Sequence, residues 1–93
     1  MILGFIDGDT ERLWNGQRSR RLSPSLQDAA RRKLRTLDAA DQLEDLLNPP
    51  GNRLEKLRGA RAGQYSIRIN DQWRICFRWR QGGPIDVEIV DYH

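Results

Sequence analysis

Four arginines at alternating positions of the stretch Gln64–Arg80 are the residues of this sequence best suited to chemistry. They are Arg68, Arg74, Arg78 and Arg80, and no acidic residue shares their alternating set. A guanidinium group binds phosphate through two parallel hydrogen bonds, which a lysine cannot do. The pattern predicts a surface for a phosphate-rich partner. The alternative is a solvated basic face that keeps the protein soluble.

The positive charge of the chain is concentrated in one segment. Residues 1–52 hold eight basic and eight acidic residues, so they balance. Residues 53–80 hold eight basic residues against Glu55 and Asp71, a net charge of +6, and residues 81–93 hold three acidic residues. Such a dense basic segment is typical of nucleic-acid binding. A further basic loop, Gln17–Arg21, is either solvated or a second phosphate contact.

Asp91, Tyr92 and His93 form a second group with chemical potential. Cutting RNA without a metal ion requires deprotonating a 2′-hydroxyl, stabilising charge on phosphorus and protonating the leaving oxygen. Arginines can stabilise that charge, and any of these three residues could assist proton transfer. Tyr92 could instead stack on a base. The alternative is a frayed terminus with a packed tyrosine.

Other catalytic and metal-binding patterns are absent from the sequence. It contains no P-loop, no dinucleotide-binding fingerprint, no nucleophile elbow and no paired histidines. Cys76 is the single cysteine and His93 the single histidine, which excludes an internal disulfide and disfavours a structural zinc site. Cys76 is better interpreted as a small filler than as a nucleophile. We therefore expect no metal and no cofactor.

The length and composition predict one soluble domain covering residues 1–93. Of these 93 residues, 38% are hydrophobic and three are tryptophan, which is enough for one core. No apolar run approaches the length of a membrane span, and the N-terminus lacks a basic region followed by an apolar one. A single cysteine fits a reducing cytoplasm. We expect a cytoplasmic protein with no membrane partner.

The arginines must be positioned by a β-hairpin. Apolar residues alternate with polar ones on both sides of the turn Asn70–Gln72, which indicates two strands with one face on a core. The core-facing set is Tyr65, Ile67, Ile69, Trp73, Ile75, Phe77 and Trp79. With a three-residue loop, Arg68 lies directly opposite Arg74. Two positive charges directly opposite each other repel, which suggests that this outward face binds an anion.

The remaining elements give an α+β domain. Ser23 and Pro24 open the main helix as N-cap and first helical residue. An acidic second helix beginning at Leu43 is expected to pack with it as a hairpin or bent pair. A last strand has Ile85, Val87 and Ile89 on one side. The other expected elements are a strand over 1–6 at the sheet edge, one or two helical turns over 10–14, and a short strand over 54–57. Together they predict an N-terminal strand, two to three helices and a mostly antiparallel sheet of three to four strands.

A resemblance to a known family covers the chain almost end to end. The run NRLEKLRGARAGQYSIRINDQWRICFRW, followed by a turn and VEIVDYH, is similar to the HigB group of plasmid-maintenance toxins in the RelE superfamily. The most specific parts are Gly63–Arg68, Trp73–Ile75 and Asp91–His93. The resemblance implies a compact RNase-like α+β fold. It also implies a toxin that enters the ribosomal A site and cleaves the mRNA codon there without metal.

The resemblance also implies partners. These are the small ribosomal subunit with its mRNA, and a HigA-like helix-turn-helix antitoxin that neutralises the toxin. Operator DNA is expected to bind only through that antitoxin. A catalytically weak subunit acting mainly as co-repressor is the alternative, and a basic protein that binds DNA through its own surface is a further one.

Residue roles carry over by position. Arg74 matches a catalytic arginine, Tyr92 the tyrosine near the end, and Asp91 and His93 its acidic and histidine neighbours, while Arg58 stands where relatives have a basic lysine. The expected RNA-binding set is Lys56, Arg61, Arg68, Asn70, Arg78 and Arg80. Two positions depart from some relatives: Glu55 stands where they have a histidine, and Asn70 where they have a second arginine. These departures favour the co-repressor alternative. If Asn70 does not help to hold phosphate, Arg68 or Arg61 takes that role.

Overall fold

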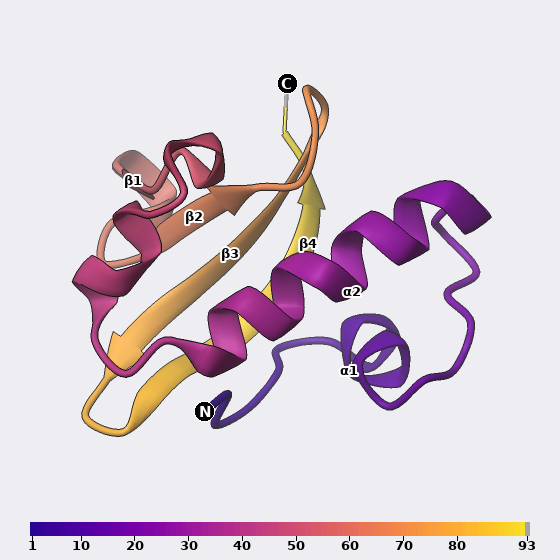
Figure 1. The fold of residues 1–93 in the computed structure, drawn as a ribbon, viewed down its shortest axis with the longest axis horizontal. Helices are drawn as coiled ribbons and strands as arrows, with labels where there is room; N and C mark the ends of the chain where they lie inside the picture. Colours follow the sequence, from indigo (N-terminus) through magenta and orange to yellow (C-terminus); the bar gives the residue numbers. More distant parts are fainter. Residues whose placement is uncertain (93) are drawn as a thin grey trace.

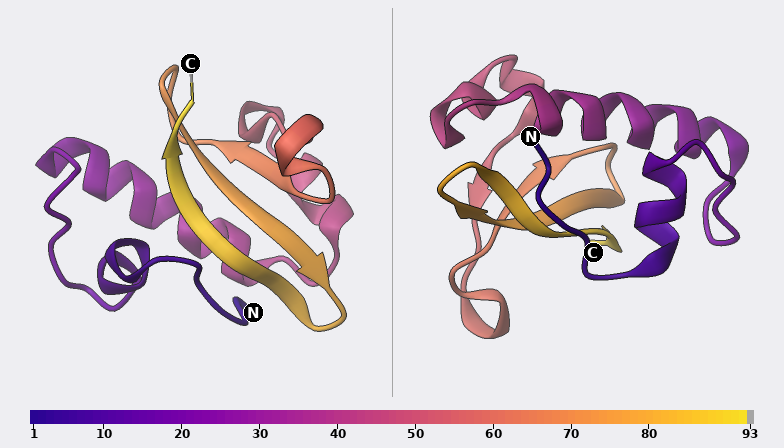
Figure 2. Two further views of the ribbon diagram at one scale, coloured as in Figure 1. Left: turned by 180° about the vertical axis from the view of Figure 1, so that it is seen from behind. Right: turned by 90° about the horizontal axis from the view of Figure 1, so that it is seen from below.

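A four-stranded antiparallel sheet with a long helix across one face forms the protein (Figures 1 and 2). The structure is a computed structural model and describes residues 1–92. The helices are α1 (Gly8–Trp14) and α2 (Pro24–Ala39), and the strands, in sheet order, are β1 (Glu55–Lys56), β2 (Tyr65–Arg68), β3 (Trp73–Arg80) and β4 (Gly83–Asp91). Three short 3₁₀ segments, η1 (Leu43–Leu47), η2 (Pro50–Asn52) and η3 (Gly59–Arg61), lie before and after β1. The predicted α+β class is confirmed.

Helix α2 begins where the sequence predicts and covers the core. The Ser23 hydroxyl accepts a hydrogen bond from the Leu26 amide at 3.3 Å, and Pro24 is the first helical residue. Ala30, Leu34 and Leu37 are fully buried at helical spacing. They pack with the buried face of the sheet, formed by Ile67, Ile69, Ile75, Phe77, Val87 and Ile89.

The β2–β3 hairpin has the predicted register. Arg68 pairs with Arg74, and Ile67 with Ile75. The turn is stabilised by Asn70, whose side-chain oxygen accepts from the Gln72 and Trp73 amides, both at 2.8 Å.

The second face of the hairpin is more buried than the alternation predicts. Ser66 and Cys76 are fully buried and Arg74 is only 7% exposed. Arg61 of η3 donates a hydrogen bond at 2.7 Å to Glu88, which is the strand partner of Cys76 on β4. The prediction that this face is open to solvent is therefore wrong for its central residues.

The last strand contains a β-bulge that the sequence does not reveal. The pairing shifts by one residue between Cys76 and Arg78, so that Arg78 lies opposite Ile85. Asp86 lies within the shift and has a φ of 54°, in the left-handed region that aspartate tolerates. Because the bulge reverses the alternation, Ile85 lies on the arginine side and is half-buried, contrary to the prediction.

The N-terminal segment runs along the outer edge of β4 without forming a full strand. Phe5 makes an isolated parallel bridge with Val87. Further along β4, the Ile89 amide donates to the Thr10 hydroxyl at 3.2 Å, and the Ile89 carbonyl accepts from Arg21 at 3.2 Å. Side chains from the first part of the chain thus satisfy this edge.

The second predicted helix is much shorter than expected. Residues Leu43–Leu47 form one 3₁₀ segment, η1. The Asp45 carboxylate accepts from the Asp41 and Gln42 amides at 2.9 and 3.0 Å, which caps the segment. Pro49 and Pro50 follow the C-cap residue Asn48 and prevent a longer helix. No helical hairpin forms there.

Candidate functional site

A pocket of about 300 Å³ opens on the arginine side of the sheet. It is lined by Arg53, Glu55, Arg68, Asn70, Asp71, Arg74 and Tyr92. These residues come from β1 and the segment before it, the β2–β3 hairpin and the position directly after β4. Three arginines and two acidic residues therefore line one small cavity.

Arg74 is the most constrained side chain of the pocket. Its Nε donates to the Ser66 hydroxyl at 2.7 Å, and its Nη2 donates to the Arg53 carbonyl at 2.5 Å. Its Nη1 lies 4.0 Å from a Glu55 carboxylate oxygen. The arginine is thus a buried, pre-oriented cation at the back of the pocket, rather than the exposed side chain that the strand pattern predicts.

Tyr92 lies beside this cation. The Arg74 guanidinium carbon is 5.7 Å from the centre of the Tyr92 ring, within the range of a cation–π contact. The Tyr92 amide donates to the Gln72 carbonyl at 2.6 Å, which attaches the end of the chain to the hairpin turn. Since the residue remains 38% exposed, the ring can still meet a ligand.

Glu55 and Arg53 are pocket residues that the sequence did not single out as site residues. The Glu55 side chain is 51% exposed and faces Arg74, so the pocket contains an accessible carboxylate. Arg53 has a φ of 45° and offers its carbonyl to Arg74. The only signal for Glu55 was its departure from the family pattern, and nothing in the sequence pointed to the Arg53 backbone.

Arg68 and Asn70 also line the pocket, but they differ in availability. Arg68 forms an ion pair with Asp71, whose side chain is fully exposed. The Asn70 side-chain oxygen accepts hydrogen bonds from the two turn amides, so the main role of Asn70 is to stabilise the hairpin turn. Arg68 is therefore the more available group for an anion.

Carboxylates from neighbouring elements accompany the arginines of this face. Arg61 contacts Glu88 at 2.7 Å, and this hydrogen bond raises the pKa of the guanidinium despite partial burial. Arg78 lies 3.7 Å from Asp86. The alternating set of hairpin residues that holds the arginines includes no acidic residue, as predicted. In the folded protein, however, β4 places Glu88 and Asp86 next to these arginines.

The other predicted residues lie outside the pocket lining. Arg58, Lys56 and Arg80 are exposed, before η3, on β1 and at the end of β3. Asp91 pairs with Trp73 across β3 and β4 and accepts from the Gln72 side chain at 3.1 Å. His93 lies outside the described residues.

Cys76 has the properties of a structural residue. It is fully buried. Burial raises the pKa of its thiol, which opposes formation of the nucleophilic thiolate. Within residues 1–92, no three His, Cys, Asp or Glu side chains are placed together to bind a metal ion.

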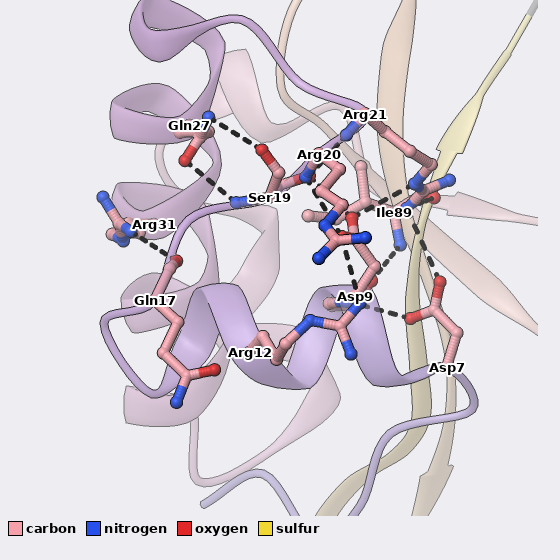
Figure 3. A network of polar contacts seen from close by, with 11 residues as sticks. Asp7, Asp9, Arg12, Gln17, Ser19, Arg20, Arg21, Gln27, Arg31 and Ile89 are labelled. Carbon is pink, nitrogen blue, oxygen red and sulfur yellow. Dashed lines mark hydrogen bonds and ion pairs between the residues drawn. The ribbon is translucent and has the colours of Figure 1, made fainter.

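The basic loop Gln17–Arg21 is largely part of the scaffold (Figure 3). Arg21 forms ion pairs with Asp9 at 3.2 Å and Asp7 at 3.5 Å, in addition to its bond with the Ile89 carbonyl. The Ser19 hydroxyl donates to Asp9 at 2.6 Å, and its backbone bonds with the Gln27 side chain. This network joins α1, the loop, α2 and β4.

Comparison with known proteins identifies the family. The model of HigB-like toxins, described as RelE-like toxins of the type II toxin-antitoxin system HigB, matches residues 4–93. The chain belongs to this family. Toxin HigB-1 of Vibrio cholerae is 45% identical over 83 residues, which are 88% of this chain and 87% of that protein. Endoribonuclease HigB of Proteus vulgaris is 33% identical over 61 residues, 66% of this chain and 65% of that protein.

A solved structure shows the same architecture as this HigB-family chain. A chain of the YoeB-YefM complex from Staphylococcus aureus matches with a TM-score of 0.63, covering 100% of this chain and 98% of that one at 17% identity. Because the identity is low, this likeness shows the fold alone. The predicted RelE-like fold is confirmed. None of the helices in the described part of the chain has the length and apolarity needed to span a membrane.

Proposed function

We propose that this HigB-family toxin is a metal-independent endoribonuclease that cleaves mRNA in the ribosomal A site and thereby inhibits translation and growth. The observation that carries the proposal is the buried, tethered Arg74 at the back of a pocket that also presents Tyr92 and Glu55. A relative named Endoribonuclease HigB supports the RNase activity.

The pocket residues and the other predicted site residues divide the parts of RNA cleavage between them. Arg74 and Arg68 of the pocket, with Arg58, stabilise the charge that develops on the phosphorus oxygens. Glu55 provides an accessible carboxylate that can accept the 2′-hydroxyl proton. Asp91 and His93 assist proton transfer at the leaving oxygen, and Tyr92 orients or stacks on a base.

The remaining basic residues of the predicted RNA-binding set provide the approach for RNA. Arg78 and Arg80 lie on β3, Arg61 lies in η3, and Asn70 is in the hairpin turn. Arg61 and Arg78 already face carboxylates, so their contribution is smaller than that of the exposed Arg80. Lys56 pairs with Tyr65, so its side chain starts from the other side of the sheet, at the exposed edge strand β1. Phosphate contacts of this kind position a nucleic acid without reading its sequence.

Membership of the family supports a proposal about partners. We propose a HigA-like helix-turn-helix antitoxin, binding of operator DNA only through that antitoxin, and a cytoplasmic location on the small ribosomal subunit. The family description as a toxin of a type II toxin-antitoxin system supports the antitoxin. The YoeB-YefM neighbour is itself a complex of two proteins.

The test is primer extension on a reporter mRNA with purified protein, with and without programmed ribosomes. We expect cuts inside the A-site codon only when ribosomes are present. Arg74→Ala and Tyr92→Ala should abolish the cuts and the growth inhibition seen without antitoxin. Arg32→Ala, which removes an exposed arginine from α2, is the matched control and should cleave like the wild type.

Other outcomes separate the alternatives. No cuts in either tube would indicate the co-repressor subunit. Cuts without ribosomes would indicate a free RNase. Unchanged growth inhibition by Arg74→Ala and Tyr92→Ala would contradict the roles given to the pocket.

A further inference from the structure

The Arg74 guanidinium is held along one edge by the protein. Its Nε donates to the Ser66 hydroxyl at 2.7 Å, and its Nη2 donates to the Arg53 carbonyl at 2.5 Å and approaches the Ser66 carbonyl at 3.4 Å. These groups occupy the edge of the guanidinium formed by Nε and Nη2. Within residues 1–92, Nη1 has only the Glu55 carboxylate, at 4.0 Å.

Because the protein holds the Nε–Nη2 edge of the Arg74 guanidinium, the direction of its remaining nitrogen, Nη1, is fixed as well. A guanidinium is planar and rigid, so two anchored nitrogens fix both its plane and its direction. Nη1 is then the nitrogen left to face an anion in the pocket. A charge held in place before the reaction stabilises a transition state without the cost of reorientation.

Ser66 is well placed to act as such an anchor. It lies on β2 directly opposite Cys76, is fully buried, and its side chain shares the sheet face of Arg74. An apolar residue of similar size would fill the space but would leave the Arg74 Nε–H without its partner. A buried donor without a partner is costly, so the arginine would turn away.

The second anchor is also built into the fold. The Arg53 amide donates to the Pro50 carbonyl at 3.1 Å, which fixes the turn that presents the Arg53 carbonyl. The neighbouring Asn52 is fully buried and accepts from Lys33 of α2 at 2.6 Å. The carbonyl is therefore held by the helix layer, and the Ser66 hydroxyl is the side-chain part of the tether.

We propose that Ser66 is a positioning residue for Arg74, which orients the guanidinium so that Nη1 meets the scissile phosphate. This inference rests on the proposed endoribonuclease function. Ser66 touches no substrate in this scheme, and it acts only through Arg74.

The test compares two truncations in the same buried layer. Ser66→Ala and Cys76→Ala each remove one heavy atom from directly paired, fully buried residues. We expect Ser66→Ala to lower the single-turnover cleavage rate on programmed ribosomes about 10- to 100-fold, as misplaced catalytic groups do. The ribosome concentration for half-maximal rate should change little. Cys76→Ala should cleave near the wild-type rate at a similar Tm, and Ser66→Thr should restore most of the lost rate.

A second measurement reports the tether without any cleavage. In NMR spectra of the free protein, the Arg74 Nε–H should exchange slowly with water in the wild type and in Cys76→Ala. In Ser66→Ala it should exchange rapidly. This measurement also decides the matter if Ser66→Thr is too large for the site.

The two proposals fail differently. If Arg74→Ala is inactive while Ser66→Ala cleaves at the wild-type rate, the positioning role is overturned and the proposed function stands. A rapidly exchanging Arg74 Nε–H in the wild type would likewise overturn the tether. If the wild type makes no cuts on ribosomes, the proposed function fails, and the positioning role of Ser66 in cleavage fails with it.

Discussion

Carboxylates accompany the cations of the candidate site. Arg74 faces Glu55, Arg68 is paired with Asp71, and an incoming phosphate must compete with these carboxylates. The two acids differ in kind. Glu55 lies beside a buried arginine, whereas the Asp71 side chain is fully exposed on the turn. Exposed ion pairs contribute little stability, so Asp71 mainly lowers the positive potential of the pocket.

Removing the Asp71 charge should therefore strengthen the approach of RNA. We expect Asp71→Asn to lower the KM for programmed ribosomes about two- to five-fold, the range that one exposed ion pair can supply. The effect should shrink as salt is raised, because the charges are exposed. Steady-state cleavage at two salt concentrations measures it. Glu44→Gln on η1 changes the net charge equally and should have no effect; an equal gain there would mean that only net charge matters.

At the scale of elements, the hairpin turn holds two parts of the pocket together. The Asn70 side chain fixes the turn, and the Tyr92 amide bonds to Gln72 in that same turn. The resemblance predicts an arginine at this position in some relatives. The hydrogen bonds of Asn70 indicate a structural role in the turn, and Asn70 also lines the pocket.

Mutation of Asn70 should accordingly affect stability. We expect Asn70→Ala to lower the free energy of unfolding by about 1–2 kcal/mol, because two turn amides lose their acceptor. Asn70→Asp keeps the acceptor oxygen and should remain close to the wild type. Urea denaturation measures both, with Gln81→Ala in the β3–β4 turn as the control. Equal stability of Asn70→Ala and Gln81→Ala would contradict the role given to the Asn70 oxygen.

The sequence is informative about elements whose signals are local. Alternation and loop length predicted the Arg68–Arg74 register, and Ser23 with Pro24 predicted the start of α2. The bulge at Asp86 was not predictable, because a one-residue shift depends on how β4 fits both β3 and the N-terminal segment. The apolar residues from Leu43 onward predicted a longer helix than η1. The cap at Asp45 and the two prolines after η1 limit it to one short segment.

The features of the candidate site also divide into those that the sequence predicted and those that it did not. Arg74 and Tyr92 were predicted from family position, and the structure brings them together. Burial of Arg74, its Ser66 and Arg53 partners, and the place of Glu55 arise from contacts between separate elements. Such contacts leave no pattern in a single sequence.

At the scale of the whole molecule, Asp9 connects the helices to the sheet through Ser19 and Arg21. Burial opposes its ionisation, but hydrogen bonds from the Ser19 and Arg21 side chains and the Arg20 amide outweigh it and lower the pKa of Asp9. A carboxyl whose pKa is lower in the folded state stabilises the fold above its unfolded pKa. That contribution is lost as the pH falls through the folded pKa.

The stability of the protein should therefore depend on Asp9 in acid. We expect the wild type to lose part of its free energy of unfolding below about pH 4, the ordinary carboxyl range. Asp9→Asn should be less stable than the wild type at pH 7, and the difference should narrow in acid. Thermal or urea unfolding across pH measures this, with Asp41→Asn as the control. A difference that stays constant with pH would show that the Asp9 charge is not the cause.

The closure of the β4 edge by Thr10 and Arg21 has a consequence for the order of synthesis. Thr10 and Ile89 are 79 positions apart, so this contact cannot form until β4 has been synthesised. Tyr92, which lines the pocket, follows β4 in the chain and emerges later still. A growing chain that still lacks β4 therefore has neither the closed sheet edge nor the complete pocket.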